Sequence, residues 1–514
     1  MKKTIIAAAM LAFGANAVTA QNLTIATSLS LNTMDPHFFN GFPAGSAHPQ
    51  IWDALTEIDE NLQVKPGLAT AWRLIDANTW EFDLRPGVRF HDGTPFTAAD
   101  ITATFARVPN VQNSPALFTS FIRAVREVTV VNDTTIRITT STPTATLPGD
   151  LARVLLVAAR DAGQTTSEFN AGRVNGTGPY RFAGYVNSES LALTRNDAHW
   201  GPRAAWGNVT IRTIARDPSR VAALLAGDVD AIDQVPTGDK ARIAADPRFR
   251  LFSGPAAVVH YIALDSARPE SPFVTGRDGT PVRNPLMDVR VRQALSMAID
   301  RNAIVTRLME GSATPASQFL PNTIDGTSPN LRPTPHDPAR ARALLAEAGF
   351  PQGFRLTLHA TTDRYPKDEQ VAQAIAQMWN RAGIQASVAG VAGQVFFTEA
   401  TRQAYSAFIA QYGTNEAGEG PRAVVHSFEA GRGYGNANRT RYSNPRVDAL
   451  IQDAMAEIDP GRRRAKLHTA IDAAFEDVAL IPVFHPSWDF AAKRGITITS
   501  RPERRFNALM MRPD

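Results

Sequence analysis

The sequence contains no cysteine, has seven lysines among its 514 residues, and has no long apolar run beyond its first twenty positions. Without cysteine the protein can form no disulfide framework, no thiol nucleophile and no cysteine-linked lipid anchor. A membrane-spanning helix needs about 20 consecutive apolar residues, and no stretch after position 20 approaches that length. We therefore expect the mature chain to be soluble.

Common catalytic motifs are also missing. The sequence has no G-x-S-x-G nucleophile elbow, no G-x-x-x-x-G-K-[ST] phosphate loop and no H-E-x-x-H zinc-binding helix. Its ten histidines are dispersed, and no two of them are four residues apart. We predict no catalytic residue, no metal site and no cofactor. Carboxylate pairs occur throughout the chain, and because the sequence does not give their separation in space, a hydrolase stays open as an alternative.

Charged residues are spread evenly. The 53 basic and 49 acidic residues are interspersed along the chain and give a formal net charge of +4. A nucleic-acid-binding surface needs basic residues gathered on one face, beside aromatic side chains. The interspersed pattern is typical of an ordinary charged surface, so no nucleic-acid partner is predicted.

The first twenty residues have the pattern of a secretory signal peptide. Lys2 and Lys3 precede an apolar stretch over residues 5–15, and Val18 and Ala20 place small residues where a signal peptidase reads. The apolar stretch is too short to span a bilayer. The pattern predicts cleavage before Gln21 and export to the periplasm, where a chain without a lipid anchor diffuses freely.

The spacing of apolar residues predicts strands followed by mixed strands and helices. Alternation over 80–85 and a hairpin over 125–140 indicate strands in the first third, and residues 354–412 read as strand, helix, strand, helix, strand. Aspartate-proline pairs, which combine an N-cap with proline at the first helical position, predict helix starts at Asp217, Asp337 and Asp459. We predict an α/β protein with at least two folding units, because a single core stops growing at roughly 250–300 residues.

Six segments, in order along the chain, carry a family resemblance. The longest, residues 80–100, reads WEFDLRPGVRFHDGTPFTAAD; its Pro-Gly and Asp-Gly pairs are turn signals, and Thr97 with Asp100 can form a capping box. The other segments are residues 34–37, 176–182, 291–301, 442–448 and 481–483. Together they resemble the dipeptide-, oligopeptide- and nickel-binding type of bacterial extracellular solute-binding protein, family 5 of those that serve ABC transporters.

The resemblance implies a two-lobe periplasmic binding protein of the Venus-flytrap type (type II, cluster C) with an extra inserted domain. The implied first lobe joins residues 21–54, 176–263 and 486–514, the inserted domain covers 55–175, and the second lobe covers 264–485. The chain would cross between the lobes near Leu264 and His485, and the two crossings would form a hinge.

The resemblance also implies that the protein binds and delivers a solute without catalysing a reaction. A monomeric protein would capture a small solute between its lobes and deliver it to the permease of an ABC importer in the inner membrane. A ligand that touches both lobes only when they close stabilises the closed form, which the transporter can recognise.

Candidate ligand contacts also follow from the resemblance. In dipeptide-binding members a second-lobe aspartate pairs with the ammonium group of the ligand, and an arginine takes its carboxylate. Arg364, followed by Tyr365, stands at a position similar to that arginine, and a guanidinium group offers a carboxylate a bidentate match. Where the aspartate would fall this sequence has Asn415, with Tyr412 before it and Glu416 after it. The loss of the acid removes the reason to prefer an α-ammonium ligand.

Three further residues are candidate contacts. Asn32 and His37 follow the first predicted strand and would belong to the first lobe, and His426 lies in a polar, loop-rich region. His426 together with Arg364 would suit a nickel chelate, which is the alternative within the family. Outside the family, a periplasmic hydrolase and a folding chaperone with a broad apolar cleft are the alternatives.

Overall fold

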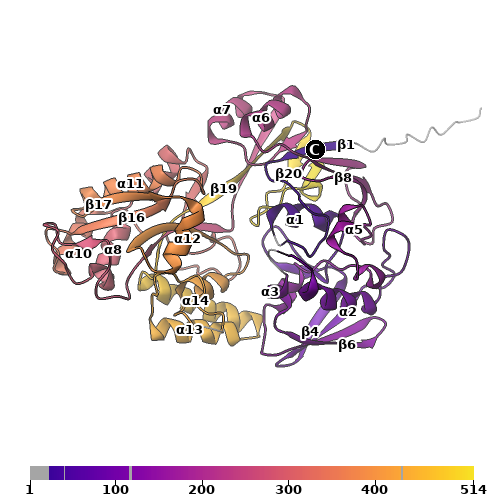
Figure 1. The fold of residues 1–514 in the computed structure, drawn as a ribbon, viewed down its shortest axis with the longest axis horizontal. Helices are drawn as coiled ribbons and strands as arrows, with labels where there is room; N and C mark the ends of the chain where they lie inside the picture. The colour runs from indigo at the N-terminus through magenta and orange to yellow at the C-terminus, as the bar shows by residue number, and fades with distance from the viewer. Residues whose placement is uncertain (1–21, 40, 115–117, 430–431) are drawn as a thin grey trace, which may run out of the picture.

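One long strand joins the two lobes of the protein. A computed structural model describes residues 22–39, 41–114, 118–429 and 432–514, so the predicted signal peptide lies outside the described residues. The lobes lie side by side, and β19 (Ile481–Lys493) runs between them (Figure 1). Its first part pairs with β13 (Val258–Leu264) and its last part with β12 (Phe249–Pro255). The sheets of the two lobes are therefore continuous through this strand.

The chain passes between the lobes at two adjacent places. It enters the second lobe at Ala256 and Ala257, between β12 and β13, and returns within β19. The crossings are tied together, since the Ala256 N–H donates to the Pro486 carbonyl at 2.9 Å and His485 Nδ1 lies 2.9 Å from the Val258 carbonyl. The first crossing precedes β13 and does not lie near Leu264 as expected, because all of β13 pairs with β18 (Ala407–Gly413) of the second lobe.

The first lobe is built on a mixed sheet that interleaves distant parts of the chain. Its strands are β1 (Asn22–Thr27), β8 (Tyr180–Val186), β9 (Ser190–Arg195), β10 (Asn208–Thr213) and β11 (Ala231–Ile232). Strand β1 pairs in parallel with β10 and β11, and β10, β9 and β8 continue antiparallel. Helices α1 (Phe42–Ala47), α6 (Asp217–Ala226) and α7 (Thr237–Ala245) also belong here. The core of the lobe gathers Trp52, Tyr180, Phe490 and Phe506.

An inserted antiparallel sheet extends the first lobe. Its strand order is β4-β5-β7-β6, with bounds Ala69–Asp76, Thr79–Leu84, Thr135–Thr140 and Val125–Asn132. The alternation over 80–85 is confirmed, because Trp80, Phe82 and Leu84 are all buried. Helix α2 (Ala98–Arg107) begins with the expected capping box. The short elements here are β2 (Thr56–Ile58), β3 (Val64–Pro66), α3 (Thr119–Ile122), α4 (Leu147–Leu151) and α5 (Thr166–Asn170).

The second lobe has the α/β alternation that the sequence predicts. Its sheet has the order β14-β16-β18-β13-β19, and β17 pairs with β16. The strands not yet given are β14 (Val274–Thr275), β15 (Ala313–Pro315), β16 (Arg355–Thr361) and β17 (Gln385–Val391). The main helices are α8 (Val289–Met297), α10 (Pro338–Glu347), α11 (Asp368–Arg381), α12 (Gly393–Thr401), α13 (Pro445–Ala456) and α14 (Pro460–Glu476). The two-lobe α/β architecture is thereby confirmed.

Of the three helix N-caps predicted from aspartate-proline pairs, two are confirmed. Asp337 and Asp459 are N-caps, and each side chain accepts a backbone N–H bond of 2.8 Å. Asp217 is not a cap, because its carboxylate accepts from Arg220 at 2.6 Å and the helix already begins at Asp217 itself. Within the described part of the chain, no helix is both long and apolar enough to cross a membrane.

An apolar cluster connects the lobes on the side away from β19. Ile58, Leu62 and Ala152 of the first lobe and its insertion pack with Leu467 and Ile471 of α14. Figure 1 shows α14 next to the inserted sheet and its helices. The lobes therefore touch at this cluster as well as at the crossing strands.

Leu62→Asn tests whether this cluster holds the two lobes together in the absence of solute. Leu62 has a backbone φ of 61°, which asparagine tolerates well, so the change removes apolar contact without adding strain. Burial of a leucine side chain contributes about 1.5–3 kcal/mol. We expect the ligand-free variant to open, with a larger radius of gyration in small-angle X-ray scattering. Leu509→Asn, at a leucine that is 47% exposed, should leave the radius unchanged; equal radii for both variants would contradict the role of the cluster.

Candidate ligand-binding site

A cavity of about 270 Å³ lies between the lobes, beside the crossing strands. The first lobe contributes the loop and helix around Phe42 and His48, and the insertion contributes Arg153. The C-terminal segment 502–505 forms the rest of that wall, and the second lobe contributes Val258, Gly413, Thr414 and Asn415. The volume is near the lower end of the roughly 300–1,000 Å³ of small-molecule sites. The cavity therefore suits a small solute.

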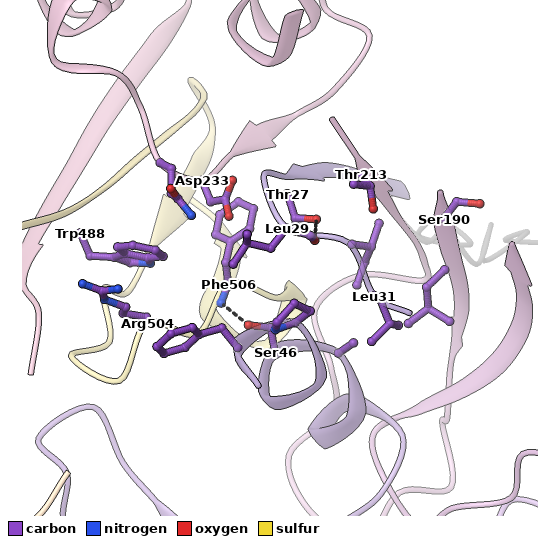
Figure 2. A pocket seen from close by; sticks show the side chains of 16 residues that line it. Thr27, Leu29, Leu31, Ser46, Ser190, Thr213, Asp233, Trp488, Arg504 and Phe506 are labelled. Atoms are coloured by element: carbon purple, nitrogen blue, oxygen red, sulfur yellow. Dashed lines mark hydrogen bonds between the residues drawn. The ribbon is translucent and has the colours of Figure 1, made fainter. Parts of the chain in front are cut away.

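The C-terminal segment presents Arg504 to this cavity from a strained backbone. Arg504 has a φ of 66°, in the left-handed region that costs energy for a residue with a β-carbon. Its guanidinium carbon lies 5.5 Å from the ring centre of Phe42 and 5.0 Å from that of Trp488. Figure 2 shows Arg504 beside Trp488 at a second, smaller pocket of about 40 Å³. Arg504 lines both pockets, so it lies where they meet.

The charged side chains of the cavity are three arginines and one glutamate: Arg153, Arg504, Arg505 and Glu503. Burial lowers the pKa of Arg153 and of Arg504, and lowers that of Arg505 to about 10. All three remain protonated near neutral pH. Glu503 is shared, with one carboxylate oxygen 2.5 Å from Arg501 Nε and 3.4 Å from Arg505 Nε. The first-lobe wall is therefore cationic.

The wall contributed by the second lobe is polar and uncharged. Thr414 and Asn415 follow β18, and the Thr414 N–H donates to the Ala257 carbonyl at 3.1 Å. Asn415 is half-buried and is the one residue, of the eight predicted as ligand contacts, that lines the 270 Å³ cavity. The position where dipeptide-binding relatives carry an acid thus faces the cavity as an amide.

Arg364 and Tyr365 lie in the loop after β16. The guanidinium carbon of Arg364 is 4.8 Å from the ring centre of Phe397, and its Nε donates to the Tyr365 hydroxyl at 3.2 Å. Tyr365 packs edge-on against His260, with ring centres 5.8 Å apart. Arg364 and Tyr365 are therefore held among aromatic rings, and neither lines the cavity.

Tyr412, Glu416 and Asn32 have other surroundings. The Tyr412 hydroxyl donates to Glu419 at 3.2 Å, and Glu416 forms an ion pair of 2.8 Å with Arg463. Asn32 is exposed and lies outside the lining of the cavity. These contacts assign Tyr412 and Glu416 to the framework that supports the second-lobe wall.

His37 has a structural environment in place of the ligand contact expected from the sequence. It is fully buried, and its Nε2 lies 2.7 Å from the Leu155 carbonyl while Arg107 donates to its Nδ1 at 3.0 Å. Arg107 also forms an ion pair of 2.7 Å with Asp35. Both ring nitrogens are thus used by the protein, and the ring fixes the loop that leads into the cavity wall.

His426 is likewise enclosed and not available to a metal chelate. It is fully buried, its Nδ1 lies 2.7 Å from the Ser427 carbonyl, and its Nε2 lies 2.9 Å from the Gln452 amide nitrogen. It lies outside the lining of the cavity, as does Arg364. Among the residues that the structure describes, no three His, Asp or Glu side chains come together as a metal-binding group.

The arginines of the cavity are the residues that sequence reasoning missed. The signal was present, since residues 501–505 read RPERR. A short run of charges usually marks a solvated surface, however, and nothing local distinguishes this run from others. Its role emerges only when the chain end returns to the cleft.

Two lobes that share crossing strands and enclose a cavity between them define a solute-binding protein. The chain belongs to the bacterial extracellular solute-binding proteins, family 5, because the model of the middle region of that family matches residues 63–434. Proteins of this family are the solute-binding components of ABC importers, and that is the function of this chain.

Curated relatives match most of the chain. The glutathione-binding protein GsiB of Pectobacterium atrosepticum is 28% identical over 475 residues, which cover 90% of this chain and 88% of the relative. The heme-binding protein A of Haemophilus influenzae is 27% identical over 477 residues, which cover 87% and 83%. The similarity thus extends through both lobes.

Solved structures confirm the fold. HbpA2 from Haemophilus parasuis superposes with a TM-score of 0.84 at 22% identity, covering 96% of this chain and 100% of that one. The periplasmic murein tripeptide binding protein MppA, in an unliganded open form, gives a TM-score of 0.82 at 22% identity and covers 96% and 98%.

Buried neutral histidines make the stability of the fold depend on pH. Burial lowers the pKa of His37, His48 and His485 to about 4 and that of His260 to about 3, whereas the unfolded chain titrates near 6.5. As pH falls from 6.5 toward 4, the unfolded state takes up protons that the folded state does not, so the free energy of unfolding decreases. Each unit of pKa difference corresponds to about 1.4 kcal/mol per group.

We expect urea denaturation to show a marked loss of stability between pH 7 and pH 5. His260→Gln should reduce this loss because it removes one of the buried titrating groups. His468→Gln, at a half-buried position on α14, should reproduce the wild-type dependence. A wild-type stability that is constant across this pH range would refute the argument.

Proposed function

We propose that the chain acts in the periplasm as a monomer that captures a small polar or peptide-like solute between its lobes and delivers it, chemically unchanged, to the permease of an ABC importer. The observation that carries the proposal is the 270 Å³ cavity, which both lobes line and which borders the crossing strands. A rotation at those strands moves the two walls apart or together.

Closure follows from the position of the walls. A solute in the cavity contacts Arg504 from one lobe and Asn415 from the other, so its binding energy favours the closed form. A shift of a two-state equilibrium from 1:99 to 99:1 requires about 5.5 kcal/mol of differential binding. Micromolar affinity provides roughly 8 kcal/mol in total. A solute of modest affinity is therefore sufficient to close the protein.

Relatives suggest which solutes to test. The similar proteins named above bind glutathione, heme or murein tripeptide, and the small cavity favours the peptide-like compounds. We assign direct contact to Asn415, whereas Tyr365, whose hydroxyl accepts from Arg364, lies outside the lining of the cavity. Tyr412 and Glu416 hold the second-lobe wall through Glu419 and Arg463.

The proposal is tested with freshly purified protein. Native mass spectrometry should detect a bound compound of low mass, and calorimetry should identify a binder among glutathione, trialanine and nickel with histidine. Addition of that binder should reduce the radius of gyration in scattering, and the compound should be recovered with its mass unchanged. Recovery of a reaction product, or binding without any change in the radius of gyration, would refute the proposal that the lobes close around a solute and deliver it unchanged.

A further inference from the structure

Three arginine side chains reach the cavity from two distant parts of the chain. Arg153 follows α4 of the insertion, and Arg504 and Arg505 lie close to the C-terminus. Arg505 Nε lies 3.4 Å from a carboxylate oxygen of Glu503, whereas Arg504 Nε is buried without a hydrogen-bond partner among the described residues. A buried cation without acceptors is costly. Oxygen atoms of a bound solute would offset that cost.

Acidic side chains near the cavity form no ion pair with Arg504 among the described residues, and most of them have other partners. Glu416 pairs with Arg463 at 2.8 Å, and Glu419 pairs with Arg422 at 2.7 Å. Burial, together with the charges of Glu416 and Glu419, raises the pKa of Asp150 to about 7, so this carboxyl is partly protonated near neutral pH. Glu503 pairs with Arg501 and Arg505, and the charge of Glu57 also acts on Arg505.

The described residues of the opposite wall include no carboxylate that could pair with an ammonium group. The second-lobe residues that line the cavity are Val258, Gly413, Thr414 and Asn415, which carry no charge. The Asn415 amide accepts and donates hydrogen bonds without a net charge. The cavity is thus electrostatically one-sided, with positive charge on the first-lobe wall and neutral polar groups facing it.

We propose that the solute carries a carboxylate that binds Arg504 and Arg505, with Arg153 adding positive charge from the insertion, and that the cleft selects acids over their neutral or cationic analogues. This inference rests on the proposed function and narrows its solute class. A guanidinium group matches a carboxylate with two parallel N–H···O bonds, so the selection has a geometric as well as a Coulombic basis.

The experiment compares matched probes at low ionic strength by calorimetry. The pairs are glutathione with its diethyl ester and trialanine with trialanine amide; the ester and the amide are called the neutral partners because their blocked carboxyl groups carry no charge, although each keeps its ammonium charge. The acid should bind at least tenfold more tightly than its neutral partner. Arg504→Gln and Arg505→Gln should each lower the affinity for the acid by about 10- to 100-fold, as expected for loss of a hydrogen bond to a charged group. Each should change the affinity for the neutral partner by less than about threefold.

Arg512→Gln is the matched control, because Arg512 is exposed in β21 (Met511–Pro513) and lies outside the cavity. It removes the same charge and should leave both affinities unchanged. Arg504→Lys and Arg505→Lys keep the charge without the bidentate fork, so they should retain part of the affinity even if a glutamine variant folds poorly. Neutral partners that bind as tightly as the acids, or glutamine variants with unchanged affinity for the acids, would overturn the inference.

Asn415→Asp provides the converse test from the other wall. A carboxylate there should repel the acid probe and lower its affinity by about tenfold. Asn415→Ser, which removes the amide without adding charge, should lower the affinity less. If no probe pair binds, the compound that co-purifies with the protein is identified instead. An acid that no longer co-purifies with the Arg504→Gln variant supports the inference, and a neutral or cationic compound overturns it. A cationic compound that still closes the lobes would leave the proposed function intact, whereas release of a reaction product would overturn that function instead.

Discussion

Strand β19 hydrogen-bonds to two sheets at once, and the arrangement of both lobes depends on this. Its first half is held by β13 and its second half by β11 and β12, so each half must move with a different lobe. Relative rotation is therefore confined to the short stretch where pairing changes, around His485 and Pro486. Because Ala257 and Val258 of the neighbouring crossing line the cavity, the site lies where a small rotation displaces its walls in opposite directions.

The buried histidines give the first-lobe wall its rigidity. His37 is fixed by Leu155 and Arg107, and His48 Nε2 lies 3.0 Å from the Thr33 carbonyl. Both rings are neutral near pH 7, since burial holds their pKa near 4. These contacts hold the residues on either side of the segment that contributes to the cavity wall.

The charge of the cavity lies on one wall. Asn415 presents an uncharged amide from the second lobe, and Arg364 packs against the ring of Phe397 outside the cavity. Positive charge enters instead from the C-terminal segment and the insertion, at Arg504, Arg505 and Arg153. The same two-lobe fold is thus compatible with a different distribution of charge between the walls, and the fold alone does not identify the solute.

Much of the secondary structure, the α/β class and the family could be predicted from the sequence, because these depend on local and cumulative patterns. The caps at Asp337 and Asp459, the alternation at Trp80 and the capping box at Thr97 act within one turn or one strand, so neighbouring residues are sufficient to predict them. Which polar residues meet in the cleft depends on the packing of distant segments and could not be predicted. His37 and His426 have no local feature that separates a ligand contact from a buried structural ring, and Arg504 reaches the cavity because the chain end packs beside α1. Such meetings depend on contacts between residues hundreds of positions apart, which no local pattern encodes.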